Sequence, residues 1–329
     1  MGETNLGPVS TKLDPGLVRV VNITGYPRSG TTIFSRLLGE LPHFFCIGEA
    51  IFVWTRGLLD NDLCGCGRSF RDCPFWGAVG QRAFGGWDHV DAERLADASR
   101  TLYPAVNRLP VRHEARRQRQ ADIRHLALSL RRMLEAVHAE SGAAWLVDSS
   151  KAYRYTRLLE RLPQTRALPV HMVRDSRGVA HSAKKPTRRP EVVDRLELIP
   201  NYSTGRLALS WTVHNLLYGL QQAGARGLRI RYEDFAKQPD VAQRRVLAAL
   251  DSPPIDLGPD RSSSGTFDLG VTHTVSGNPN RFSTGPSIIR EDRSWRQSLS
   301  RSDWLTATLI TLPLLGRYGY LTQSGDALP

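Results

Sequence analysis

A short segment near the amino terminus, ITGYPRSGTTI at residues 23–33, constrains the fold of this chain more than any other. The residues before it, 17–24, are apolar and β-branched, which predicts a buried strand. Residues 32–41 after it carry apolar side chains at helical spacing. A glycine-containing turn between a buried strand and a helix is a setting in which proteins bind phosphate groups, because backbone N–H groups and the helix dipole point at one place.

The loop departs from the nucleotide triphosphatase motif G-x-x-x-x-G-K-[ST] at one position, where Thr31 replaces the lysine. Its only strong cation is Arg28, whose planar guanidinium can bind two oxygens of one anion. We therefore predict an intact loop for a different phosphate-containing ligand. Its candidate contacts are Arg28, Ser29, Gly30, Thr31 and Thr32.

The pattern of the remaining chain predicts the fold class. Further buried strands are predicted at 144–147, 166–173 and 228–232, each followed by a helical pattern. This alternation predicts an α/β fold with a P-loop-like central parallel sheet and helices on both faces, in three α/β/α layers. Residues 60–86 and 251–288 are predicted loops, and helical patterns cover 91–140 and 293–315, with a break expected near Pro313.

Together with the strand before it, PRSGTT resembles the 5′-phosphosulfate loop of sulfotransferases that use 3′-phosphoadenosine 5′-phosphosulfate (PAPS). The similarity is to bacterial-type members and to the carbohydrate and tyrosylprotein branches, in which Lys or Arg stands at the position of Arg28. The resemblance implies that PAPS is the cosubstrate, that 3′-phosphoadenosine 5′-phosphate (PAP) is the product, and that no metal ion is required. The acceptor is expected to be a hydroxyl of a small molecule, lipid or carbohydrate.

The resemblance also implies a domain organisation. It covers about residues 17–50, 144–185, 228–235 and 270–297. We expect a tail over 1–16 and a single domain over 17–329. The segments 60–140 and 186–204 fall outside the resemblance and are predicted to be insertions that build the acceptor pocket.

A second anion site is implied for the 3′-phosphate of PAPS. The family supplies it from an Arg that ends a strand and a Ser eight residues later, and Arg174 and Ser182 stand at that spacing. Arg174 follows the carboxyl end of a predicted strand, where α/β folds bind ligands. A structural salt bridge to Asp175 or to another carboxylate is the alternative role for Arg174.

Two further segments match the family's nucleotide contacts. The run SGNPNR near the carboxyl terminus resembles the late loop that closes over the nucleotide, which makes Ser276, Asn278 and Arg281 candidates. A surface Asn-Pro turn is the alternative for this run. Tyr232 matches a position near the adenine, and core packing is its alternative.

Glu49 is the candidate general base for the acceptor hydroxyl. It follows the first predicted helix and matches the catalytic Glu of the Arg-containing branches. Its alternative role is a surface carboxylate or a salt-bridge partner of a nearby Arg. Lys151 is a candidate for stabilising the bridging oxygen, although family members place such a Lys slightly earlier in the chain. Ser149 or Ser150 is the alternative nucleotide contact in this segment.

Three of the four cysteines, Cys64, Cys66 and Cys73, lie within ten residues. A metal site needs three or four ligands, and His89 or Cys46 would be the fourth. We favour local packing of the thiols with a neighbouring Trp and assign no metal ligand, and metal binding by the three cysteines is left open.

Charge and hydropathy exclude several classes of function. The net charge is +12, and all but five of the 44 basic residues are Arg, which favours an anionic cofactor or substrate over nucleic acid, since no nucleic-acid-binding motif is present. No apolar run approaches the roughly 20 residues that span a bilayer, and the start lacks the apolar core of a secretory signal. We therefore expect a cytoplasmic enzyme without stable membrane insertion. The oligomeric state is left open.

Two alternative functions stay open. A P-loop small-molecule kinase using ATP and Mg²⁺ would explain WLVD at 145–148, which resembles a strand ending in a Mg²⁺-binding Asp148. Thr31 in place of the lysine argues against it. A non-catalytic regulator would keep the nucleotide site and lack the base.

Overall fold

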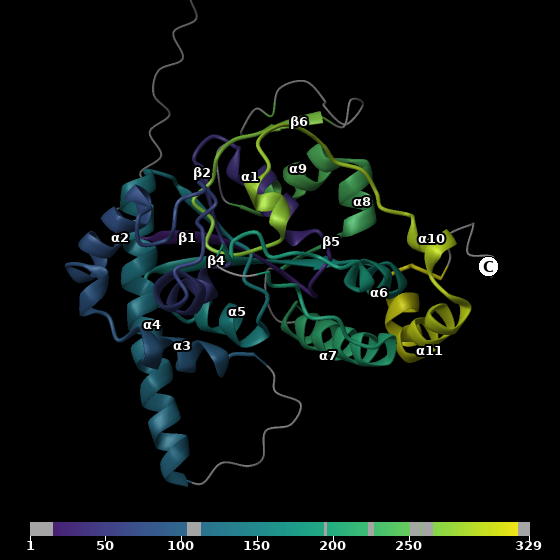
Figure 1. Cartoon of the computed structure of the whole chain (residues 1–329), viewed down its shortest axis with the longest axis horizontal. Coiled ribbons are helices and arrows are strands. Elements are labelled where there is room, and N and C mark those ends of the chain that lie inside the picture. Colours follow the sequence, from purple (N-terminus) through teal and green to yellow (C-terminus); the bar gives the residue numbers. More distant parts are fainter. Residues whose placement is uncertain are drawn as a thin grey trace, which may run out of the picture.

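The computed structural model describes residues 16–103, 113–193, 196–222, 227–250, 257 and 266–321. Five strands form one parallel sheet in the order β2-β3-β1-β4-β5, at the centre of the molecule (Figure 1). They are β1 (Val18–Gly25), β2 (Phe44–Gly48), β3 (Trp145–Asp148), β4 (Thr165–Val173) and β5 (Leu228–Arg231). A separate antiparallel pair joins β6 (Thr266–Leu269) and β7 (Gly285–Ile288).

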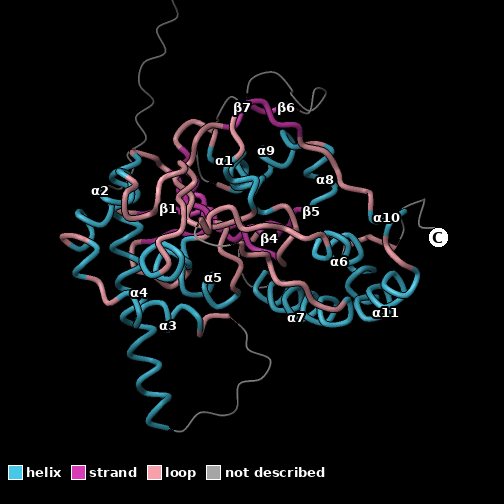
Figure 2. Tube along the Cα trace, in the orientation of Figure 1, coloured by secondary structure: helices cyan, strands magenta, loops and turns pink. Residues whose placement is uncertain are grey.

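Helices cover both faces of the sheet (Figure 2). Val20 and Val21 are consecutive in β1 and belong to two different core clusters, since successive strand residues point to opposite faces. One cluster includes residues of α2 (Pro74–Phe84), α3 (Ala92–Arg100), α4 (His113–Ser141) and α5 (Tyr153–Leu159). The other includes residues of α1 (Thr31–Gly39), α8 (Tyr232–Lys237) and α9 (Pro239–Ala249). The predicted three-layer α/β/α class is confirmed.

A third core cluster lies beside the sheet and joins Tyr26 to α6 (Ser176–Lys184), α7 (Thr204–Gln222) and α11 (Arg301–Arg317). The short helix α10 (Trp295–Ser298) precedes α11, and η3 (Trp87–His89) follows α2. Two short helical segments, η1 (Ala50–Phe52) and the π-helix η2 (Val53–Leu59), follow β2 directly, and η4 (Pro279–Phe282) lies in the late loop. No helix in the described ranges is long and apolar enough to cross a membrane.

Several predicted elements were wrong. The strand β2 was missed because its five residues end in glycine and follow α1 closely, so they carry no clear period. The helix α2 was missed within a Gly- and Cys-rich stretch, although Pro74 at its start and Gly85 past its end are standard helix boundaries. The predicted break near Pro313 lies instead at Leu299, and Ser300 caps α11.

Candidate active site

The carboxyl ends of all five parallel strands contribute a candidate residue to the same edge of the sheet. The loop after β1 carries Arg28, β2 leads to Glu49, β3 to Lys151, β4 to Arg174 and β5 to Tyr232. Because parallel strands present their carboxyl ends at one edge, these side chains, which are far apart in sequence, are brought to one edge. The edge is therefore the candidate active site.

The loop between β1 and α1 is held in left-handed backbone conformations. Arg28 has φ of 71° and Gly30 has φ of 82°, and a left-handed conformation at a non-glycine residue is often found at functional sites. A Cβ atom on Gly30 would lie 2.6 Å from Cδ2 of Tyr232, so the loop packs against the first residue of α8. Gly30 is favoured here because its backbone is left-handed and because a side chain would collide with Tyr232.

Gly30→Ala tests this close packing. Gly285 is the matched control, because its φ of 80° is nearly the same and a Cβ atom added there would meet no other part of the protein within 4 Å. We expect Gly285→Ala to lose about 1–2 kcal/mol of unfolding free energy from the left-handed backbone alone. We expect Gly30→Ala to lose that amount plus about 1–3 kcal/mol for overpacking against Tyr232. Denaturant unfolding measures both, and equal losses would contradict the close packing.

The side chain of Arg28 crosses to α6 and the segment after it. Its Nε donates to Ser182 Oγ at 3.2 Å, and its Nη2 donates to the Ser182 carbonyl and to Thr187 Oγ1, both at 3.2 Å. Burial, followed by the nearby charge of Arg174, lowers the pKa of Arg28. The structure thus brings together Arg28 and Ser182, which the sequence assigned to two different phosphate sites.

Arg174 lies against the same loop. Its Nη1 donates to the Arg28 carbonyl at 2.9 Å, its Nη2 donates to Asp292 Oδ2 at 3.3 Å, and its guanidinium carbon lies 4.4 Å from the centre of the Tyr232 ring. Partial burial acts to raise the pKa of Asp292, but hydrogen bonds from Ser294 and the charge of Arg174 lower it to about 2. Arg174 thus forms the salt bridge that was its alternative role, with Asp292 as the other carboxylate, while the neighbouring Asp175 pairs with Arg177.

Glu49 and Lys151 form an ion pair between the ends of β2 and β3. Both side chains are nearly buried, with exposed fractions of 10% and 12%. The Glu49 backbone N–H donates to the Ser276 carbonyl at 3.4 Å, which connects this pair to the late loop. The candidate base therefore lies in a partly desolvated site with one cation in direct contact.

The late loop closes against α1. The Asn278 backbone N–H donates to Thr32 Oγ1 at 3.1 Å, so a residue of the phosphate loop and a residue of the SGNPNR run are in contact. Arg281 is 1% exposed, and its guanidinium donates to the carbonyls of Thr274 and Leu63 at 2.5 and 2.6 Å. Burial lowers the pKa of Arg281 to about 10. The geometry of Arg281 favours holding the loop over contacting a ligand.

Comparison with known proteins identifies the family. A scan of protein families matches residues 21–256 to the Sulfotransferase family. The chain belongs to the sulfotransferase family. A search of curated proteins finds no match.

Solved structures of two sulfotransferases match most of this chain. The sulfotransferase domain from the Synechococcus PCC 7002 olefin synthase is 18% identical, with a TM-score of 0.37 over 90% of this chain and 95% of that one. Sulfotransferase STF9 from Mycobacterium avium is 14% identical, with a TM-score of 0.43 over 92% of this chain and 77% of that one.

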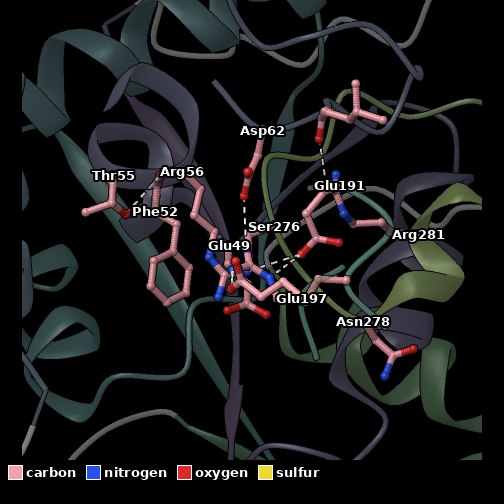
Figure 3. Close-up of polar contacts among 12 residues, drawn as sticks. Glu49, Phe52, Thr55, Arg56, Asp62, Glu191, Glu197, Ser276, Asn278 and Arg281 are labelled. Atoms are coloured by element: carbon pink, nitrogen blue, oxygen red, sulfur yellow. Dashed lines mark hydrogen bonds and ion pairs between the residues drawn. The ribbon is translucent and has the colours of Figure 1, made fainter. Parts of the chain in front are cut away.

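Sequence analysis missed one functional candidate of this sulfotransferase, Arg56 in the π-helix η2. Its Nη1 donates to Ser276 Oγ at 2.7 Å and lies 3.6 Å from Glu191 Oε1 (Figure 3). Its guanidinium carbon is 4.6 Å from the centre of the Phe52 ring. Arg56 and Glu49 both form a hydrogen bond with Ser276, so Arg56 lies beside the candidate base. The π-helical turn that carries Arg56 is of a kind frequent at functional sites. Nothing in the local sequence FVWTRGLL indicates this role.

The two predicted insertions of the sulfotransferase contact each other near the site. Arg189 pairs with Asp62 at 2.8 Å, with Glu191 at 3.1 Å and with Glu197. The Leu63 backbone N–H donates to the Glu191 carbonyl at 3.1 Å. The segments 60–140 and 186–204 are thus joined next to Arg56, and their role in acceptor binding stays a prediction.

The carboxylate at the end of β3 is fully engaged by protein groups. Asp148 Oδ1 accepts hydrogen bonds from the Ser150 backbone, the Ser150 hydroxyl and the Ala50 backbone, and Oδ2 accepts one from Tyr155 at 2.6 Å. Burial raises the pKa of Asp148. These partners give Asp148 a structural role, which argues against its use as a Mg²⁺ ligand by a kinase.

Proposed function

We propose that this sulfotransferase transfers a sulfuryl group from PAPS to a hydroxyl of a small-molecule, lipid or carbohydrate acceptor. The observation that carries the proposal is the convergence of Arg28, Ser182, Arg174 and Tyr232 at the carboxyl edge of the sheet. Two guanidinium groups, a hydroxyl and an aromatic ring in contact form a suitable site for a nucleotide with two separate anionic groups. The family match over residues 21–256 supports sulfuryl transfer as the reaction class.

The polar atoms of the loop fit a phosphate-containing group. Among the described residues, Ser29 Oγ and Arg28 Nη1 are buried and have no hydrogen-bond partner. Buried donors without partners cost about 1–3 kcal/mol each, so a ligand that accepts from them would be favoured. We propose that Arg28, Ser29, Gly30, Thr31 and Thr32 hold the 5′-phosphosulfate.

Arg174 and Ser182 are proposed to bind the 3′-phosphate. Arg174 is 5% exposed and contacts Asp292 and the Tyr232 ring, so an arriving phosphate would compete with the carboxylate of Asp292. Ser276 and Asn278 are proposed to complete this site from the late loop. Direct contact of Arg281 with the phosphate stays a prediction, and its contacts with two carbonyls support a positioning role.

Bound PAPS supplies a sulfuryl group on its 5′-phosphate, and the chain supplies charge stabilisation and a base. Arg28 and the loop N–H groups stabilise the negative charge that grows on the departing phosphate. Glu49 accepts the proton of the acceptor hydroxyl as the oxygen attacks sulfur in line. Lys151, in contact with Glu49, fixes the orientation of the carboxylate and adds positive charge at the bridging oxygen. We propose that the reaction needs no metal ion and takes place in the cytoplasm.

Binding of PAP and of ADP, each with and without Mg²⁺, tests the donor. Titration calorimetry of the full chain should show PAP binding that is independent of Mg²⁺ and much tighter than ADP binding, because only PAP carries a 3′-phosphate. A kinase would bind ADP as tightly or tighter, with dependence on Mg²⁺. That result would exclude the proposed donor.

A regulator without catalysis is separated from an enzyme by turnover. An assay that follows PAP release from PAPS across hydroxyl acceptors should detect activity in the wild-type chain. Tight PAP binding without turnover on any acceptor would favour the regulator.

A further inference from the structure

Three cysteines and one histidine form a compact cluster. The potential ligand atoms of Cys64, Cys66, Cys73 and His273 all lie within 4.8 Å of one another. The sulfurs of Cys66 and Cys73 are 3.7 Å apart. The Nδ1 atom of His273 lies 3.2 Å from Cys73 Sγ and 3.8 Å from Cys64 Sγ.

The fourth member of this cluster differs from the residues that the sequence offered. His89 is exposed at the end of η3, and Cys46 is buried in β2 where it packs against Gly39. His273 was missed because it is 200 residues from Cys73 along the chain.

Three of the six distances between the ligand atoms are close to those around one tetrahedral zinc ion, and all six lie within 4.8 Å. Ligand bonds of about 2.3 Å to sulfur and about 2.0 Å to nitrogen place two sulfurs about 3.8 Å apart and a sulfur and a nitrogen about 3.5 Å apart. The observed distances of 3.7, 3.2 and 3.8 Å lie around these values. A disulfide would need two sulfurs at about 2.05 Å, and all four cysteines of the chain are free.

The backbone holds the ligands in place. The Gly67 N–H donates to the Cys64 carbonyl at 2.8 Å, and the Cys64 N–H donates to the Arg68 carbonyl at 2.8 Å, which forms a tight turn around Cys66. Cys73 immediately precedes α2. The four ligands thus come from three segments of the chain, namely a turn, the start of a helix and the late loop. The local backbone of one segment does not fix the position of the other two.

Aromatic groups fix the His273 ring. Phe75 stacks on it with ring centres 4.9 Å apart and an angle of 20° between the planes, and Phe45 stacks with centres 6.5 Å apart. Trp76 Nε1 donates to the His273 carbonyl at 2.8 Å. Packing explains the position of Trp76, but it does not require an imidazole nitrogen to point at the sulfurs of Cys64 and Cys73.

We propose that Cys64, Cys66, Cys73 and His273 bind one Zn²⁺ ion in a tetrahedral structural site. Three thiolates and an imidazole are soft and borderline ligands that suit zinc, and four protein ligands leave no open position for catalysis. Binding releases the thiol protons to solvent, and the oxidation state of the metal does not change. Cys66 and His273 are partly exposed, which gives the ion a path of entry.

The ion would fix the late loop to the catalytic edge. His273 is three residues before Ser276, the Gly65 N–H donates to the Thr274 carbonyl at 2.9 Å, and the Val275 N–H donates to the Ile47 carbonyl at 3.3 Å. These contacts adjoin Ser276, whose carbonyl accepts a hydrogen bond from the Glu49 backbone N–H. The metal would therefore stabilise the loop that is proposed to close over the nucleotide. The proposed zinc ion would be structural and would take no part in the sulfuryl transfer, which is proposed above to need no metal ion.

Metal content of the full chain tests the proposal. Protein expressed with added zinc and dialysed against metal-free buffer should carry about one zinc per chain by mass spectrometry. Replacement by Co²⁺ should give the visible spectrum of a tetrahedral cobalt site together with thiolate-to-cobalt charge transfer. His273→Ala and Cys66→Ser should lose the metal.

Matched controls distinguish zinc binding at this cluster from nonspecific zinc binding by other histidines or thiols. His89→Ala and Cys46→Ser each remove a residue of the same type outside the cluster and should keep about one zinc per chain. Far-UV circular dichroism shows whether each variant is folded. If the cluster variants do not fold, the zinc content and the cobalt spectrum of the wild-type chain still test the proposal.

Three results would overturn the proposal. They are a folded wild-type chain that holds no zinc after expression with zinc, a cobalt spectrum without tetrahedral thiolate bands, and iron in place of zinc. Folded Cys66→Ser or His273→Ala protein that retains a full zinc complement would equally exclude these ligands.

Discussion

Glu49→Gln is expected to lower kcat by a factor of about 10²–10⁴, the usual contribution of a positioned general base. The amide has nearly the shape of the carboxylate but cannot accept the proton of the acceptor hydroxyl. Affinity for PAP should stay the same, because Glu49 is placed to act on the acceptor. Initial rates with PAPS and calorimetry with PAP measure the two effects separately.

A second substitution at Lys151 distinguishes a base from a residue that only holds Lys151. In a Lys151→Ala background, Glu49→Gln should lower kcat further if Glu49 is the base, and should cause no further loss if Glu49 acts only through its contact with Lys151. Glu160→Gln is the control, since Glu160 forms a partly buried pair with Arg157 at 3.2 Å at the end of α5, away from the candidate base. A Glu49→Gln enzyme that retains most of its activity would remove Glu49 from the mechanism.

Arg174→Ala is expected to abolish the preference for a nucleotide with a 3′-phosphate. A charge-assisted hydrogen bond is worth about 1.5–3 kcal/mol, which corresponds to a roughly 10- to 150-fold loss of PAP affinity. Affinity for AMP, which lacks the 3′-phosphate, should change little. Calorimetric titration of both nucleotides gives the preference as a ratio.

Two further variants define how Arg174 acts. Arg174→Lys keeps the charge but loses the planar fork, so it should recover only part of the PAP affinity. Lys185→Ala removes another cation that lies 3.5 Å from Asp292 and is half-exposed, and it should retain the preference for PAP. Equal loss of PAP and AMP affinity in Arg174→Ala would instead mean that Arg174 holds the loop through the Arg28 carbonyl.

Local signals explain which parts of the fold were predictable. The strand, glycine loop and helix at 18–39 were predicted correctly. The periodic apolar residues and the glycine and hydroxyl residues of the loop all lie within about twenty consecutive positions. The pair of Arg174 and Ser182 was predicted from the resemblance to the sulfotransferase family, and its binding of the 3′-phosphate stays a prediction. By contrast, β2 and α2 were missed, because a short apolar run and a Gly- and Cys-rich helix carry weak periodic signals.

Contacts between distant segments were not predictable from one sequence. The hydrogen bond from Arg56 to Ser276 joins residues 220 positions apart, and the contact of Cys73 with His273 joins residues 200 positions apart. Only the packing of η2 and the late loop against the edge of the sheet brings these groups together.

Local sequence was sufficient to predict the α/β fold class, which depends on hydrophobic period over a few turns of chain. The family was predicted from the resemblance of the PRSGTT loop, and phosphate binding by that loop through Arg28 stays a prediction. The folded chain was needed to show that Glu49 pairs with Lys151, that Asp292 balances Arg174, and that His273 completes the cysteine cluster. Such pairings are set by how the elements pack around the core, because partners distant in sequence meet only after the chain has folded.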